Sequence, residues 1–151
     1  MALQPGTQPV KGAQLFVSVA VPATFDKTGY EALTWTKVGR VQEIGTIGAS
    51  TEVVSFTDLD GNTEKHQGAT NNGALTPTLG VDETDAGQAL LYTSSKSGVE
   101  LSTKVLLKSG AARYNGGRAF GMPETIGQVN SIVTAAPRIE LNRETVRVAA
   151  T

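Results

Sequence analysis

The segment 82–98, DETDAGQALLYTSSKSG, is the only stretch whose two ends both carry helix signals. The Asp82 carboxylate can accept hydrogen bonds from the backbone N–H groups that the first turn of a helix leaves unpaired. Asp85 lies near the positive end of the helix dipole, and Lys96 lies near its negative end. Gly98 stands where a left-handed C-terminal residue is favoured. The apolar stripe consists of Ala86, Ala89, Leu90 and Thr93. A single helix with so short a stripe must pack on a sheet.

The rest of the chain is patterned as strands. Val, Ile and Thr carry much of the apolar pattern, and aromatic residues make up only 5%. Residues 99–108 alternate best between apolar and polar. Residues 15–21 are apolar on both faces, which indicates burial on both sides, in a sandwich core or a subunit contact. Further strands are expected at 34–44, 52–57, 74–81, 119–122, 129–134 and 139–148, with a turn at Asn115-Gly116 or Gly116-Gly117. We therefore predict a mainly β fold, a β-sandwich or barrel of two packed sheets flanked by one α-helix.

Two polar segments interrupt this pattern. Residues 1–13 contain two Pro and two Gly among polar residues, which predicts an extended arm, although such a tail is commonly flexible in an isolated chain. Residues 58–72 have almost no apolar content, and Asp60-Gly61 is a hairpin-turn dipeptide. So long a polar loop is usually functional or disordered, or it forms a hairpin arm that becomes ordered against a neighbour. We predict one domain, 14–151, with a polar loop at about 55–73 and an arm at 1–13.

Composition limits the class of protein. A chain of 151 residues is most simply one domain with a real core. The absence of Cys excludes disulfides, thiolate metal ligands and a Cys nucleophile. No apolar run approaches the roughly 20 residues that a membrane helix needs. The N-terminus has no apolar segment of the secretory type, so we expect synthesis in the cytoplasm and no membrane association.

Charge is distributed unevenly along the chain. The net charge of −1 argues against a dedicated nucleic-acid binder. Residues 1–95 hold ten acids and five bases, a net of −5, whereas residues 96–151 hold eight bases and four acids, a net of +4. The two halves can pair within one fold, which is the commoner case. Alternatively, surfaces of opposite charge meet between copies and give head-to-tail self-association.

No motif supports catalysis, a cofactor or a metal. His66 is the only histidine, and no G-x-S-x-G elbow presents a nucleophile to it. The acidic segment 58–64 fails as an EF-hand loop, because Gly61 falls at position 4 and Ala69 at position 12. The run Asn115-Gly116-Gly117-Arg118 lacks the P-loop pattern. We predict that the protein is not an enzyme and has no catalytic, cofactor or metal site.

Several short motifs occur in a particular order along residues 9–148. They are Pro9-Val10-Lys11-Gly12-Ala13, Trp35-Thr36-Lys37-Val38-Gly39-Arg40-Val41, the acidic segment 55–64, His66-Gln67-Gly68, Gly87-Gln88-Ala89-Leu90-Leu91 and Arg143-Glu144-Thr145-Val146-Arg147-Val148. In order and spacing they resemble the tail tube proteins of bacteriophages with long, flexible, non-contractile tails. The chain shows no sign of the immunoglobulin-like domain that some relatives add.

The resemblance implies a structural role in the virion tail. It implies hexameric rings that stack head-to-tail into a tube, whose lumen holds the tape-measure protein and later conducts DNA without binding it specifically. It also implies contacts with tail terminator and tail-tip proteins, and synthesis in the host bacterial cytoplasm. The arm and the polar loop would reach neighbouring rings. The expected inter-subunit contact residues are Pro9, Lys11, Asp58, Asp60, Glu64, Lys65 and His66.

Two other classes of function remain open from the residues alone. A ligand- or carbohydrate-binding β-sandwich would usually expose aromatic side chains at its site. An enzyme, such as a hydrolase using His66, would need catalytic partners that no motif identifies.

Overall fold

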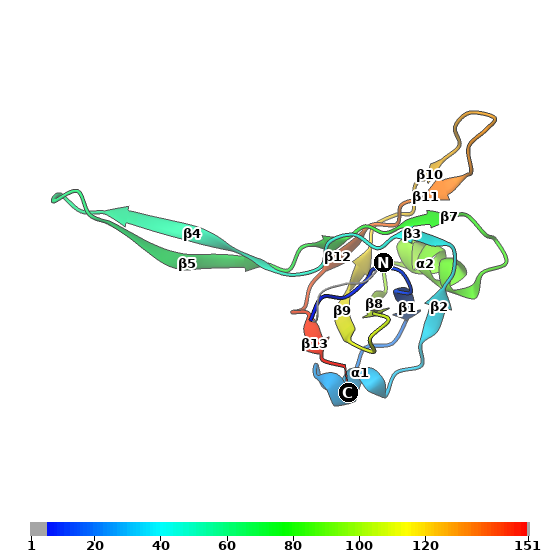
Figure 1. Cartoon of the computed structure of the whole chain (residues 1–151), viewed down its shortest axis with the longest axis horizontal. Coiled ribbons are helices and arrows are strands. Elements are labelled where there is room, and N and C mark those ends of the chain that lie inside the picture. Colours follow the sequence, from blue (N-terminus) through cyan, green and yellow to red (C-terminus); the bar gives the residue numbers. More distant parts are fainter. Residues whose placement is uncertain (1–5, 151) are drawn as a thin grey trace.

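The computed structural model describes residues 6–150 as a β-sheet body from which one long hairpin projects (Figure 1). The main sheet is seven-stranded and antiparallel, with the order β2-β1-β8-β9-β12-β6, and β13 also pairs with β9. Its strands are β1 (Gln14–Ser18), β2 (Thr36–Val38), β6 (Ala74–Leu75), β8 (Glu100–Leu106), β9 (Ala112–Ala119), β12 (Ile139–Leu141) and β13 (Val146–Val148).

The centre of the main sheet is the β8–β9 pair, in register from Glu100↔Arg118 to Leu106↔Ala112. The turn between them contains Gly110, whose φ of 99° is accessible mainly to glycine. The prediction of a turn near Gly116 was wrong, because the glycine-rich run is part of strand β9. Gly117 is required there by packing: a Cβ at this position would lie 2.0 Å from the Glu140 carbonyl oxygen of β12.

A second sheet covers one face of the main sheet. It has the order β10-β11-β7-β3 and comprises β3 (Val41–Glu43), β7 (Thr78–Gly80), β10 (Glu124–Thr125) and β11 (Thr134–Ala135). The main core lies on this face and consists of Leu15, Val17, Val38, Leu75, Leu79, Leu91, Leu101, Val105, Ala119, Ile139 and Leu141. The mainly β fold of two packed sheets is thereby confirmed.

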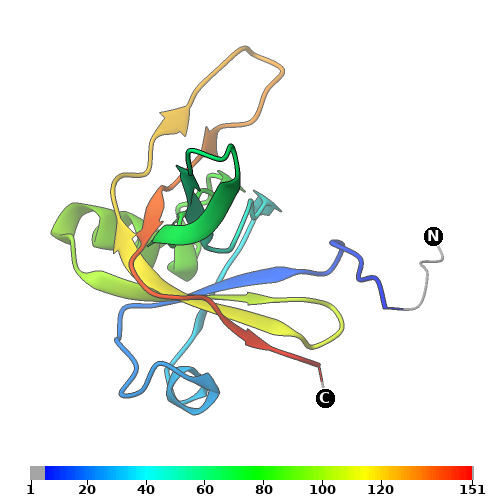
Figure 2. The same ribbon diagram turned by 90° about the vertical axis from the view of Figure 1, so that its left-hand side faces the viewer.

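Helix α2 (Ala86–Ser97) packs on the main sheet, against β1, β2 and β9 (Figure 2). Its C-cap is Gly98 with φ 70°, as the sequence predicts. Its N-cap is Asp85 and not Asp82, because Asp85 accepts from the Gln88 backbone N–H at 3.0 Å. Asp82 instead stabilises the preceding turn by accepting from the Thr84 hydroxyl and backbone N–H. These hydrogen bonds, the Thr84 hydroxyl first, lower the pKa of Asp82.

The opposite face of the main sheet carries a second, smaller helix, α1 (Lys27–Glu31), where the sequence suggested only a loop. Asp26 caps it by accepting from the Gly29 backbone N–H at 2.8 Å, which lowers the pKa of the Asp26 carboxyl. Tyr30 stacks on Tyr114 of β9 with ring centroids 5.2 Å apart. Trp35 is half-buried against this cluster. A five-residue helix is too short for its apolar pattern to be recognised in the sequence, and it is stabilised by its tertiary packing.

Strand boundaries also differ from the sequence prediction. The run expected at 15–21 ends at Ser18, and Val19 and Val21 are exposed. The run 34–44 breaks at Gly39 and Arg40 and feeds two different sheets, as β2 and β3. Residues 126–133 form a loop where the sequence suggested a strand at 129–134.

Gln88 joins three elements at the buried end of α2. Its side-chain amide donates to the carbonyl oxygens of Gly39 and Gly80, both at 2.9 Å, and its carbonyl accepts from the Asp82 N–H at 3.0 Å. We expect Gln88→Met to lower the free energy of unfolding by about 3 kcal/mol, because three part-buried backbone groups lose their partner. Denaturant titration measures this. The control is Gln128→Met, at an exposed loop position, and an equal loss there would contradict the role of Gln88.

Burial raises the pKa of the Tyr30 and Tyr114 phenols above the usual 10.0, although the Arg143 guanidinium beside Tyr30 opposes the shift. The unfolded chain therefore releases these protons first, so stability is full below pH 10 and falls as pH rises above it. We expect Tyr30→Phe to reduce this alkaline loss, measured as the difference in unfolding free energy between pH 8 and pH 11. Tyr92→Phe, at an exposed ring, is the control. An unchanged pH dependence in Tyr30→Phe would refute the assignment.

Candidate assembly surfaces

The polar segment that the sequence marked as a loop at about 55–73 is a β-hairpin. Strand β4 (Ser50–Thr57) pairs with β5 (Thr63–Asn71) and with no other strand of the described chain. The pairing is regular from Val53↔Gln67 to Thr57↔Thr63, with an irregularity between Thr51 and Val53. The sequence predicted most of β4 as a strand at 52–57, but β5 is polar on both faces because both meet solvent, which hides its strand character in the sequence.

The hairpin tip is organised by Asp58. Its carboxylate accepts from the backbone N–H groups of Asp60 at 3.0 Å and Asn62 at 2.9 Å. Gly61 has φ 86°, which agrees with the turn predicted at Asp60-Gly61. Leu59 sits on this turn with its side chain fully exposed, at 107%. A large apolar side chain held in water at the end of an arm has no stabilising role in the isolated chain.

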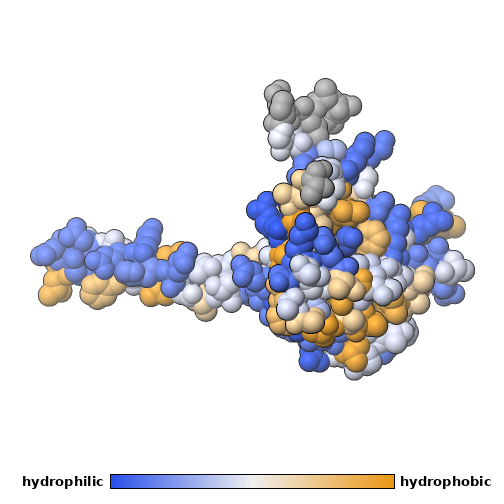
Figure 3. All heavy atoms as spheres, turned by 90° about the horizontal axis from the view of Figure 1, so that it is seen from below, coloured by the Kyte–Doolittle hydropathy of each residue, from blue (hydrophilic) through white to orange (hydrophobic). Residues whose placement is uncertain are grey.

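The two faces of the hairpin differ in chemistry. The register places Val54 opposite His66 and Phe56 opposite Glu64, so these four side chains share one face. Val54 is 51% exposed and Phe56 is 59% exposed. The other face carries mainly hydroxyl, amide and ammonium groups. In the space-filling view the arm is hydrophilic along one side and more apolar along the other (Figure 3).

An isolated two-stranded hairpin is only marginally stable in water. Here both outer edges of the hairpin lack a partner strand in the described chain, and apolar side chains are exposed at the tip and on one face. Covering these groups with protein would remove apolar area from water and pair free backbone groups. The hairpin therefore has the properties of a segment completed by another chain.

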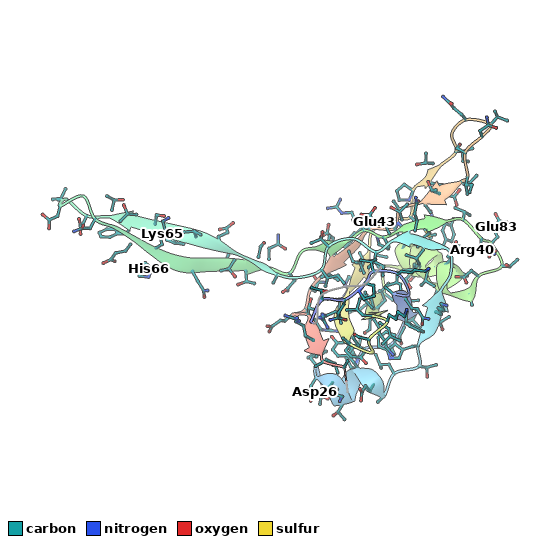
Figure 4. The ribbon with its side chains drawn as sticks, viewed as in Figure 1. Asp26, Arg40, Glu43, Lys65, His66 and Glu83 are labelled. Atoms are coloured by element: carbon teal, nitrogen blue, oxygen red, sulfur yellow. The ribbon has the colours of Figure 1, made fainter. Side chains whose placement is uncertain are left out.

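The contact residues expected from the sequence fall in two places. Asp58, Asp60, Glu64, Lys65 and His66 all lie on the hairpin, where Lys65 and His66 are far from the sheet body (Figure 4). Pro9 and Lys11 are exposed in the arm, near the β8–β9 turn. The hydroxyl of Ser109, in the β8–β9 turn, donates to the Gln8 side chain of the arm at 2.5 Å. Residues 1–5 of the predicted arm lie outside the described residues, and the two groups are not brought together in one chain.

Sequence reasoning missed the apolar groups on these surfaces. Val53, Val54, Phe56 and Leu59 are exposed on the hairpin, although their strand and turn positions were read correctly. A second projection, the loop 126–133 between β10 and β11, extends from the body (Figures 1 and 2). It contains no charged residue and exposes Ile126 by 76%, Val129 by 96% and Ile132 by 78%. The sequence signal that could have identified these exposed groups was the presence of apolar residues at irregular spacing in a loop.

The described residues offer little for chemistry. His66 is exposed, and its Nε2 lies 3.5 Å from a Glu64 carboxylate oxygen. Between residues 6 and 150, no three His, Asp or Glu side chains are grouped so that they could hold a metal ion. No helix in that part of the chain has the length and apolar content needed to cross a membrane.

Comparison with known proteins finds no matching family model and no curated protein of similar sequence. Solved structures do match. A chain of the anti-feeding prophage baseplate superposes with a TM-score of 0.67 at 8% identity, covering 100% of this chain and 99% of that one. A chain in the extended sheath/tube terminator of the extracellular contractile injection system PVC gives 0.63 at 13% identity, covering 95% and 99%. The SPP1 tail tube gives 0.61 at 12% identity, covering 92% and 78%.

The chain has the tail-tube fold. The expected resemblance to phage tail tube proteins is confirmed at the level of the fold. The matching structures include a phage tail tube and a contractile injection system, so the fold is common to both kinds of machine.

The exposed apolar face of the hairpin generates a prediction. We expect Val54→Ser/Phe56→Ser to leave the unfolding free energy of the unassembled chain unchanged within about 0.5 kcal/mol, since both side chains are already exposed. The same variant should lose self-association, measured by sedimentation. The matched control is Ser55→Thr, on the polar face of the same strand. A large loss of stability in the unassembled double variant would show that the face packs within its own chain.

Proposed function

We propose that the protein is a structural subunit of a phage tail tube. Copies assemble into hexameric rings, and the rings stack head-to-tail into a tube through which DNA passes into the host. The tail-tube fold supports this role, and one matching chain comes from a baseplate described as six-fold symmetrised. The protein acts in the tail of the virion and not as an enzyme.

The observation that carries the proposal is the projecting hairpin β4–β5. It exposes apolar side chains, and within residues 6–150 its two strands pair only with each other, so both outer edges are free. A chain that functions alone gains nothing from such an arm, and exposed strand edges favour aggregation. In a stack of rings whose arms contact neighbouring rings, the arm is buried in every ring except the one at the end.

The proposal includes the partners that the tube requires. A tape-measure protein fills the lumen before ejection, and tail terminator and tail-tip proteins cap the two ends. The chain is made in the host bacterial cytoplasm and functions in a long, non-contractile tail. A nearly neutral subunit, with a net charge of −1, suits a lumen through which DNA slides without specific binding.

Electron microscopy of the concentrated protein tests the proposal directly. We expect rings and tubes in the wild-type chain. Replacing residues 51–70 by Asn-Gly joins Ser50 to Asn71, which already pair, through a two-residue hairpin turn. This variant should keep its cooperative unfolding and remain monomeric. Wild-type protein that stays monodisperse at high concentration, also with tail-tip components present, would refute the assembly role.

A further inference from the structure

Two arginines face each other across the β9–β13 pair. Arg113 and Arg147 are register partners, so their side chains leave the sheet on the same face. Like charges directly opposite one another destabilise a sheet. Neither arginine has a carboxylate partner within residues 6–150; Arg113 donates only to the Ala112 carbonyl oxygen, at 3.1 Å.

Three other arginines have a carboxylate partner: Arg40 pairs with Asp82, Arg138 with Glu140, and Arg143 with Glu100. Arg118 has no ion pair in residues 6–150 either, but it donates to the Gly98 carbonyl oxygen at 2.7 Å and does not face another arginine. Arg113 and Arg147 differ from all of these because they lie directly opposite each other without a carboxylate. Planar guanidinium groups held side by side are suited to a carboxylate, which they bind through paired hydrogen bonds.

The arginine pair lies in a cleft with apolar walls. Both side chains line the cleft, together with Val10, Ile44, Ile47, Val105 and Leu107. A second hollow, which contains both arginines as well, continues toward Gln8 and Ser109. We call this the arginine cleft. A segment that fills it must offer an apolar side chain next to carboxylates.

The hairpin tip has this composition. Leu59 is fully exposed between Asp58 and Asp60. Asp58 is occupied by the backbone of the turn, whereas the Asp60 carboxylate has no ion pair or hydrogen bond in the described chain. Across residues 50–71, four acids and one lysine give the hairpin a net charge of −3 with His66 neutral.

The tip cannot reach the arginine cleft of its own chain. Residues Ile44 and Ile47, which line the cleft, come just before the base of the hairpin at Ser50. Eight residues of strand carry the tip about 26 Å from that base. Figure 1 shows the hairpin leading straight away from the body. A contact between tip and cleft must therefore join two copies, and it uses different surfaces on each, which propagates an assembly.

We propose that the acidic hairpin tip of one copy inserts into the arginine cleft of the next, with Leu59 against the apolar wall and Asp60 on Arg113 and Arg147. Glu64, near the tip on β5, adds negative charge at the mouth of the cleft. This inference rests on the proposed self-assembly and names the surfaces that carry it. The Asp60 carboxylate supplies the opposite charge that offsets the repulsion between the two arginines.

Charge reversal tests the pairing in the full chain. We expect Asp60→Lys/Glu64→Lys, the tip variant, and Arg113→Glu/Arg147→Glu, the cleft variant, each to raise the protein concentration needed for assembly by at least about tenfold. An equimolar mixture of the two should assemble again, because each reversed tip then meets a reversed cleft and each native tip meets a native cleft. Light scattering and electron microscopy measure both effects.

Controls separate this contact from a general effect of charge. Glu83→Lys and Arg138→Glu change the same kinds of charge at exposed positions outside the tip and the cleft, and both should assemble as the wild type does. Assembly lost equally in these controls, or no rescue in the mixture, would overturn the inference. Wild-type tubes with normal assembly of the tip and cleft variants would refute the contact while leaving the proposed function standing. No tubes from any chain would refute the proposed function itself.

One further readout distinguishes an assembly site from a structural one. Below the assembly concentration, Arg113→Glu alone should raise the melting temperature, because it replaces a repulsive cross-strand pair by an attractive one. The same substitution should weaken assembly. A variant that loses both stability and assembly would show that Arg113 supports its own fold instead.

Discussion

The Gln88 amide is the interaction on which the arrangement of the two sheets depends. It ties the helix α2 to the corner between β2 and β3 and to the end of β7. Asp85 reinforces the same corner, since its carboxylate accepts from both the Gln88 and Gly39 backbone N–H groups. Gly87 allows the approach, because a Cβ there would lie 2.3 Å from the Lys37 carbonyl oxygen. The strand that crosses from one sheet to the other is thus held at its bend.

With that corner held, the body is complete without the segments that project from it. The body buries its core with β1, β8, β9 and α2, and the segments outside it project into solvent. A two-stranded arm, an uncharged loop at 126–133 and two facing arginines are each unfavourable in an isolated chain. Their shared property is that each becomes favourable against a complementary surface. A subunit of a polymer meets such a surface in every neighbour.

The body of the fold was readable to a useful extent from local pattern. The alternation at 99–108 predicted β8, and Gly98 predicted the end of α2, since neither depends on distant residues. The N-cap was misplaced because Asp82 and Asp85 are both competent; Asp85 accepts from the Gln88 and Gly39 backbone N–H groups, whereas Asp82 accepts from Thr84. The run at Gly116 and Gly117 was taken for a turn, because its glycines serve close strand packing and not chain reversal.

The sequence by itself determined the β-rich class, the position of the helix and the two polar segments, because periodicity and turn residues act over a few positions. Only the tertiary structure decided that the acidic segment is an extended hairpin, since a strand solvated on both faces leaves no alternation to read. It alone placed Arg113 beside Arg147, 34 positions apart in the chain, through the register of β9 and β13. The proposed arginine cleft depends on such distant neighbours, which local pattern does not contain.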